Sequence, residues 1–238
     1  MSEGGTEHEG LLGGSFDPVH YGHLRLAAET RERFRLDRVV FVPAHVSPHK
    51  RDQPVTPARH RREMLRLALL DEPAFGLSDI ELQRKGVSYT VDTLEALRAE
   101  GGVRKEFYLI MASDTFRELG AWKDYRRILE LVHVLVAARP GEAPGDPAES
   151  LRRLFQEPSP YEPPSSGENM REYRRRDNGR RLVFFQLKTP MAVSSCQIRD
   201  RIHQKASIKN FLPPQVEHYI IENNLYGFTK PNPQSFRE

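Results

Sequence analysis

Short apolar runs alternate along this chain with longer segments in which apolar residues recur at helical spacing. The runs predict β-strands at residues 11–14, 38–42, 75–77, 107–111, 132–138 and 182–187. The helical spacing predicts helices over 22–35, 56–70, 91–100, 197–204 and 214–223, with a further helical stretch around Trp122. Strands of this kind, alternating with helices, are typical of a parallel sheet covered on both faces. The pattern therefore predicts an α/β protein with a doubly wound parallel sheet and a small helical part at its C-terminal end.

Local signals mark several helix boundaries. Thr56 is expected to cap one helix, with Pro57 at its first position. Thr90 is expected to cap the next helix, which Gly101 ends.

The alternation breaks between residues 140 and 181. Prolines crowd the first part of this stretch, and a charged run fills residues 171–181. Leu151, Leu154 and Phe155 can form one amphipathic turn, and the remainder is expected to be loop or partly disordered. An RNA-binding patch at residues 174–176 is an alternative, but only Tyr173 interleaves those arginines, which favours a solvated insertion. We expect an N-terminal tail (1–9), one domain (10–227) with this insertion at about 141–181, and a C-terminal tail (228–238).

Composition narrows the class of protein. With 36 basic and 33 acidic residues, the chain of 238 residues has a net charge of +3, which favours a mildly basic protein without a nucleic-acid partner. No apolar run approaches the roughly 20 residues of a membrane span, so no membrane partner is expected. Residues 1–10 lack the plan of a signal peptide. The single cysteine, Cys196, excludes an intramolecular disulfide and a Cys-based zinc site and favours a reducing cytoplasm.

The most informative stretch is residues 13–23, which read Gly-Gly-Ser-Phe-Asp-Pro-Val-His-Tyr-Gly-His. A strand that turns through glycine into a helix directs backbone N–H groups at one point, where the helix dipole is positive. His20 and His23 at that point make a site for a polyphosphate. The alternatives are a metal site or a capped helix start, but no third ligand stands at zinc spacing.

A second cationic site lies far along the chain, in residues 192–199. Ser194 or Ser195 can cap the following helix and so leave its backbone N–H groups for a phosphate. Arg199 lies four residues after Ser195 on the same helical face, and its planar guanidinium suits a phosphoryl oxygen. A capped helix with a solvated arginine is an equal alternative for this motif alone. Lys50 adds a third cation, after the second predicted strand, and alone would be read as a surface residue.

These three elements stand near the carboxyl ends of predicted strands, where open α/β sheets bind ligands. The chain lacks the G-x-x-x-x-G-K-[ST] loop of one ATPase class and the full G-x-G-x-x-G fingerprint of dehydrogenases. A phosphate-rich ligand bound without either motif is therefore expected.

Residues 13–23 resemble the signature of the nucleotidyltransferase superfamily with the H-x-G-H motif, and residues 194–199 resemble its second signature, S-S-T-x-I-R. Further stretches are similar to the bacterial nicotinate-nucleotide adenylyltransferase family: 41–50, 88–93, 113–114 with Trp122, 139–141 and 212–226. The resemblance covers about residues 10–227 outside the insertion. It implies a Rossmann-like nucleotidyltransferase fold and the adenylylation of nicotinate mononucleotide by ATP, with release of pyrophosphate.

The resemblance also implies roles for individual residues. His20, His23, Lys50 and Arg199 are expected to act on the phosphates of ATP. ATP binding is expected from Gly13, Gly14, Ser15, Phe16, Gly22, Ser194, Ser195 and Ile198. Nicotinate mononucleotide is expected at Ser88, Tyr89, Thr90, Asp114 and Trp122, although Trp122 alone could equally be a core anchor. Mg²⁺ is expected to be carried on the ATP phosphates, with no metal ligands from the protein.

Two departures from the family pattern stand at the site: Ala112 replaces a glycine, and Cys196 replaces a threonine. The alternative functions are a sibling enzyme, such as a phosphopantetheine adenylyltransferase, and a non-catalytic nucleotide-binding regulator. Intact His20, His23 and Arg199 favour an enzyme, and a homo-oligomer is left open.

Overall fold

The computed structural model describes residues 5–48, 54–101, 105–138, 147–155, 159–167, 169–189 and 191–227. An eight-stranded sheet runs through this part of the chain in the order β3-β2-β1-β4-β5-β8-β7-β6. Neighbouring strands from β3 to β8 are parallel. They are β1 (Glu7–Gly14), β2 (Arg38–Pro43), β3 (Phe75–Leu77), β4 (Lys105–Ala112), β5 (His133–Ala137) and β8 (Arg181–Phe185). The six predicted strands are thus confirmed, with ends that shift by a few residues.

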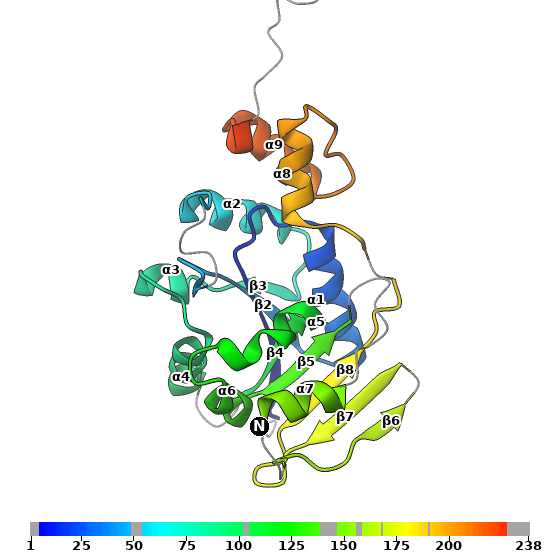
Figure 1. Ribbon diagram of the computed structural model, residues 1–238. Coiled ribbons are helices and arrows are strands. Elements are labelled where there is room, and N and C mark those ends of the chain that lie inside the picture. The colour runs from blue at the N-terminus through cyan, green and yellow to red at the C-terminus, as the bar shows by residue number, and fades with distance from the viewer. Residues whose placement is uncertain are drawn as a thin grey trace, which may run out of the picture.

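Helices cover both faces of the sheet, as the doubly wound prediction requires (Figure 1). One core contains buried residues of α1 (Tyr21–Phe34), α2 (Ala58–Ala68), α8 (Ser195–His203) and α9 (Pro214–Glu222). The opposite core contains buried residues of α4 (Thr90–Gly101), α6 (Tyr125–Leu131) and α7 (Pro147–Leu154). Shorter elements are α3 (Ile80–Arg84), α5 (Ser113–Arg117), η3 (Leu119–Ala121) and η4 (Leu225–Gly227). The expected small helical part is α8, α9 and η4; α9 packs against α2, and η4 contacts both α8 and α9 (Figure 1).

The middle and carboxyl-end positions of the central strands are largely apolar because both faces of the sheet are buried there. Leu11 packs into the core on the α4 side, while its neighbour Leu12 packs into the core on the α1 side. Leu109 and Ile110 divide between the two cores in the same way. Successive side chains of a strand point to opposite faces, so consecutive positions are apolar where both faces are buried.

The described part of the insertion contains two strands where loop or partial disorder was expected. β6 (Ser165–Gly167) pairs antiparallel with β7 (Met170–Arg174), and β7 pairs antiparallel with β8, so the predicted parallel sheet carries an antiparallel edge. The charged run is therefore partly strand, with Tyr173 buried on its inner face. Leu151, Leu154 and Phe155 are buried in and just after α7, which confirms the predicted amphipathic segment. β7 pairs with the otherwise free edge of β8, and the charged composition of this segment does not show that pairing.

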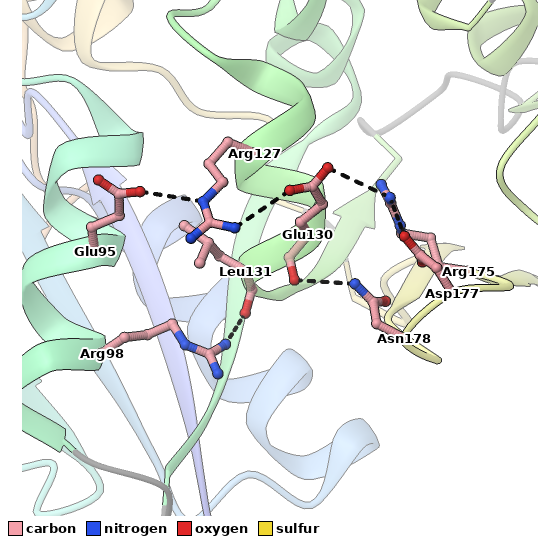
Figure 2. Close-up of polar contacts among 8 residues, drawn as sticks. All are labelled: Glu95, Arg98, Arg127, Glu130, Leu131, Arg175, Asp177 and Asn178. Atoms are coloured by element: carbon pink, nitrogen blue, oxygen red, sulfur yellow. Dashed lines mark hydrogen bonds and ion pairs between the residues drawn. The ribbon is translucent and has the colours of Figure 1, made fainter.

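Polar contacts hold the turn after β7 against the helices of the neighbouring layer (Figure 2). Arg175 binds Asp177 and lies 3.7 Å from a carboxylate oxygen of Glu130 on α6. Arg127, also on α6, contacts both Glu130 and Glu95 of α4. Arg175, like Arg174, Arg180 and Arg181 of the insertion, thus has a carboxylate partner within the molecule, in keeping with a structural role for this segment.

Most element boundaries shift by one to a few residues from the predictions, and two of these shifts bear on specific expectations. β1 begins at Glu7, inside the expected N-terminal tail, because Glu9 forms ion pairs with Arg38 and Lys105 on the two flanking strands. α2 begins at Ala58 with Pro57 as its N-cap, one residue later than predicted. None of the helices in the described ranges combines the length and apolar character needed to cross a bilayer.

Candidate active site

A cavity of about 570 Å³ opens at the carboxyl ends of the central parallel strands. Its lining includes the last residues of β1, β4 and β5: Gly13, Gly14, Ala112 and Ala137. The chain order reverses between β1 and β4, and open α/β sheets bind ligands outside the strand ends at such a switch point. The cavity therefore occupies the position where this architecture binds its ligands.

The loop after β1 folds back over its own glycines. Phe16 has a φ of 49° and lies under the loop, 2% exposed. A β-carbon on Gly14 would be 3.2 Å from the Phe16 ring, so the close approach depends on glycine. Phe16 belongs to the core, whereas the other residues expected here, Gly13, Gly14 and Ser15, line the cavity.

His20 and His23 stand together at the start of α1 and both line the cavity. Their rings are stacked with centroids 3.7 Å apart, and the backbone N–H of His20 donates to Nδ1 of His23 at 3.3 Å. The edge of Phe16 meets the His23 ring at 5.0 Å between centroids. The two imidazoles are thus held in a defined orientation by the helix start and by the core beneath them.

Gly22 lies in close contact with the histidine arrangement, so a side chain here would press on its neighbours. A β-carbon at Gly22 would lie 3.0 Å from Nδ1 of His20 and 3.1 Å from Cγ1 of Val193. Val193 precedes α8, so the missing side chain lets the second motif approach the first. The absence of a side chain at residue 22 therefore lets the His20 ring and Val193 pack close to the start of α1.

The second motif is docked directly onto the first. Ser195 donates its hydroxyl to the carbonyl of Pro18 at 2.8 Å. Nη1 of Arg199 donates to the carbonyl of Asp17 at 2.7 Å. Both residues line the cavity, so α8 and the loop after β1 form two sides of one site. Segments that are far apart in sequence are thereby joined by side chains that remain next to the cavity.

Other residues of the second motif divide between capping, cavity and core. Ser194 is the N-cap of α8, accepting from the backbone N–H of Gln197 at 3.1 Å, as predicted. Cys196 is exposed and lines the cavity, with its Sγ 3.6 Å from a carboxylate oxygen of Asp200. Ile198 is fully buried in the core, so its side chain supports α8 from below.

At the other end of the cavity the lining comes from the start of α4 and from the segment after η3. Ser88, Tyr89, Thr90 and Trp122 all line this end. The Ser88 hydroxyl accepts from the backbone N–H of His45 at 2.9 Å, which ties this segment to the loop after β2. The structure thus brings four of the five residues expected at the nicotinate mononucleotide site to one end of the cavity.

Asp114, expected at the nicotinate mononucleotide site, does not itself line the cavity. Asp114 accepts from the backbone N–H of Thr115 at 2.9 Å in the first turn of α5, and Thr115 is the residue that lines the cavity. Lys50 lies outside the described residues, although Ser47 and Pro48 of the same loop line the cavity.

Sequence reasoning missed buried charged groups around the site. Glu81 on α3 lines the cavity, accepts from the Thr93 hydroxyl at 2.8 Å, and has its pKa raised by burial. Arg61 on α2 is 2% exposed and donates to three backbone carbonyls behind the loop after β1. Arg61 falls in helical register with buried Met64, Leu65 and Ala68. A charge on the apolar face of a predicted helix was the available signal.

The donor set around the cavity suits an anion better than a metal. Within the ranges that the structure describes, no three His, Cys, Asp or Glu side chains are grouped to hold a metal ion. Imidazoles, a guanidinium and helix N-termini are instead the groups that bind phosphates.

Comparison with known proteins gives consistent matches. The model of the cytidylyltransferase-like family matches residues 11–201. A protein of Syntrophotalea carbinolica named "Probable nicotinate-nucleotide adenylyltransferase" is 43% identical, over 91% of this chain and 96% of its own length. A relative of the same name in Geobacter sulfurreducens is 39% identical, over 92% and 97%.

A solved structure shares the fold at lower sequence identity. It is the nicotinic acid mononucleotide adenylyltransferase of Plasmodium falciparum, complexed with NaAD, and it is 19% identical with a TM-score of 0.68. The superposition covers 94% of this chain and 98% of that one. This similarity shows that the mixed sheet and its helices follow a known nucleotidyltransferase architecture.

Proposed function

Since this chain belongs to the cytidylyltransferase-like family and, within it, to the nicotinate-nucleotide adenylyltransferases, we propose that it transfers the adenylyl group of ATP to nicotinate mononucleotide. The products are nicotinate adenine dinucleotide and pyrophosphate. The observation that carries the proposal is the docking of Arg199 and Ser195 onto residues 17 and 18, beside His20 and His23, around one cavity.

The chemistry needs no nucleophile from the protein. A phosphate oxygen of the mononucleotide attacks the α-phosphorus of ATP in line, while the bond from that phosphorus to the pyrophosphate oxygen breaks. The attacking phosphate monoester is mostly ionised at pH 7, because its second pKa is about 6. No general base is therefore required, and catalysis rests on positioning and charge stabilisation.

We assign the triphosphate to the end of the cavity where the two motifs meet. His20 and His23 donate to the phosphates, with His20 nearest the α-phosphate. Arg199 uses one of its five N–H groups on Asp17 and keeps others for phosphate oxygens. Ser194 and Ser195 place the N-terminus of α8 beside the phosphates, and Gly13, Gly14 and Ser15 line the junction of the two substrates. Lys50 supplies a further cation from the loop after β2.

The nicotinate end fits the opposite part of the cavity. Thr90 begins α4, and backbone N–H groups at a helix start favour a carboxylate over a neutral carboxamide. Trp122 offers a ring face to the positively charged pyridinium. Ser88 holds this end against the loop after β2, so both substrates are positioned by one connected lining.

ATP is used as its Mg²⁺ complex in this proposal. Mg²⁺ commonly keeps several waters and binds through substrate phosphates, which suits a described lining without a cluster of metal ligands. When bound, the ion neutralises charge on the phosphates. The single, exposed Cys196 suits a reducing compartment, so we propose a cytoplasmic location.

Product identification tests the function. The purified protein is incubated with ATP, Mg²⁺ and nicotinate mononucleotide, and products are identified by mass and by pyrophosphate release. We expect dinucleotide and pyrophosphate in equal amounts, and a loss of about 10²–10³ in kcat for His20→Ala. His218→Ala, at an exposed histidine of α9, is the matched control and should keep wild-type turnover. Transfer to phosphopantetheine alone would identify the sibling enzyme, and absence of transfer would favour the regulator.

A further inference from the structure

Arg61 is a buried cation that directly supports the wall of the active site. Its Nη1 donates to the carbonyl of Ser15 at 2.7 Å, its Nη2 to His45 at 3.1 Å and its Nε to Thr56 at 2.8 Å. These carbonyls belong to three segments: the loop after β1, the loop after β2 and the approach to α2. Ser15 lines the cavity, and His45 lies between cavity-lining residues of its loop.

Asp17 forms the second half of this support. Its carboxylate accepts from the backbone N–H of Thr56 at 3.2 Å and from the Tyr226 hydroxyl at 2.7 Å. Its backbone carbonyl is the acceptor that holds Arg199. Burial raises the pKa of Tyr226, so this hydroxyl remains a donor. Asp17 thus connects the phosphate end of the cavity to α2 and to the C-terminal η4.

The two buried charges are placed for geometry rather than for general stability. Burial lowers the pKa of Arg61, while the nearby Asp17 carboxylate favours its charged form. An apolar side chain beside Met64 and Leu65 would fill such a position without the desolvation cost of a guanidinium, and buried charges seldom stabilise a fold more than apolar residues do. What the guanidinium adds is a rigid fork whose donors fix several carbonyls at once.

We propose that Arg61 and Asp17 are positioning residues, which together hold the loop after β1 and the loop after β2 in the geometry needed for adenylyl transfer. The inference rests on the proposed function for its kinetic readout. Neither residue is placed in contact with substrate. They act through Ser15, through Arg199 and through the His45–Ser88 link, and therefore on the phosphate end first.

Arg61→Lys tests this role, because lysine keeps the charge but is a compact donor that lacks the planar fork. We expect kcat per folded molecule to fall about tenfold or more and KM for ATP to rise. Arg62→Lys is the matched control, because its side chain lies on the outer side of α2 against Asp79. The control should keep kcat and both KM values within about twofold of wild type.

The effect of a substitution on folding is distinguished from its effect on catalysis by measuring the folded fraction together with kcat and KM. Circular dichroism and melting give the folded fraction, and a purely structural role would lower that fraction while leaving KM for ATP unchanged. Wild-type kcat and KM for ATP per folded Arg61→Lys molecule would overturn the proposal. If Arg61→Lys does not fold, Tyr226→Phe decides, because it removes only the hydroxyl that holds Asp17. A severalfold loss of kcat supports the proposal, and wild-type kinetics overturn it.

Calorimetric titration of ATP keeps this inference separate from the proposed function. If wild-type protein makes no dinucleotide, the proposed function fails. The positioning role is then judged by ATP affinity alone. The variant tested is Arg61→Lys, or Tyr226→Phe if Arg61→Lys does not fold. A loss of about tenfold or more in its affinity for ATP, with no loss in Arg62→Lys, supports the role. An affinity equal to that of wild type overturns it.

Discussion

Nη1 of Arg199 donates to the backbone carbonyl of Asp17 at 2.7 Å, across 182 positions of sequence. This bond makes one residue both a structural clamp and a candidate phosphate ligand. A lysine has one compact ammonium group, which cannot hold the carbonyl and a phosphate with the same fork. We expect Arg199→Lys to lower kcat/KM for ATP by about 10²–10³, measured by pyrophosphate release.

The control for this substitution lies on the same helix. Arg201 also donates to a backbone carbonyl, that of Ser207 at 2.7 Å, but it does not line the cavity. Arg201→Lys should therefore keep kcat/KM within about threefold of wild type. Equal losses for the two variants would contradict a specific role of Arg199.

Gly22→Ala tests whether the position of the His20 ring affects activity independently of the stability of α1. The added β-carbon would meet Nδ1 of His20 at 3.0 Å and displace the ring. Alanine is favoured over glycine in a helix by about 1 kcal/mol, which offsets part of the strain. We expect kcat to fall at least about tenfold while the melting temperature changes little. Full activity of this variant would show that the observed position of the His20 ring is not needed.

Chemical labelling of Cys196 can measure ATP binding without measuring catalysis. It is the only cysteine of the chain, it is exposed, and it lines the phosphate end of the cavity. Bound ATP should shield it, so labelling by a maleimide is expected to slow about tenfold at saturating ATP and Mg²⁺. Mass spectrometry measures the labelled fraction, and unfolded protein should label equally fast with and without ATP. An unchanged rate in the folded protein would move ATP away from α8.

Trp122 and the start of α4 set the expected substrate preference. We expect nicotinate mononucleotide to exceed the nicotinamide form about tenfold in kcat/KM, because a helix start favours the carboxylate. Trp122→Ala should raise KM for the mononucleotide about tenfold without changing KM for ATP. Trp122→Phe keeps a ring face and should stay within about threefold of wild type. Equal use of both mononucleotides would refute the carboxylate site.

His133 makes the fold sensitive to acid. Burial, and then the adjacent Arg180, lower its pKa from 6.5 to about 4. The unfolded chain therefore binds this proton more readily, so stability rises with pH between about 4 and 6.5 and is lost as the pH falls through that range. From pH 7.5 to pH 5 the loss attributable to His133 is about 2 kcal/mol, measured by urea unfolding.

A substitution isolates this contribution. His133→Gln should remove most of that pH dependence, although the free energy of unfolding at pH 7.5 also falls because His133 accepts from the backbone N–H of Arg181. His218→Gln, at an exposed position, should leave the pH dependence unchanged. The same slope in wild type and His133→Gln would assign the acid sensitivity to another group.

The family and the architecture were predictable because their signals are local. The middle of each central strand is buried on both faces and is apolar, and each covering helix shows its own apolar face. The two cationic motifs also carry their own turn, cap and charge. His20, His23, Ser194, Ser195 and Arg199 could therefore be selected before the fold was known, and the structure brings them to one cavity.

Other features depended on contacts between distant segments. Phe16 and Ile198 stand within the motifs, yet their side chains are buried, since a motif does not show which of its residues faces the core. β7 and β8 are close in sequence, but their pairing depends on the edge that β8 presents once it has joined the parallel sheet, and a run of arginines does not reveal that edge.

The sequence by itself determined the six parallel strands, the main covering helices and the chemical groups available to bind phosphates. Only the tertiary structure decided what surrounds those groups. Arg61 and Asp17 matter because three chain segments present carbonyl and N–H groups to them, and such burial exists only after the segments have packed. Propensity and spacing act within a few residues, whereas desolvation and hydrogen bonding to distant backbone depend on the whole fold.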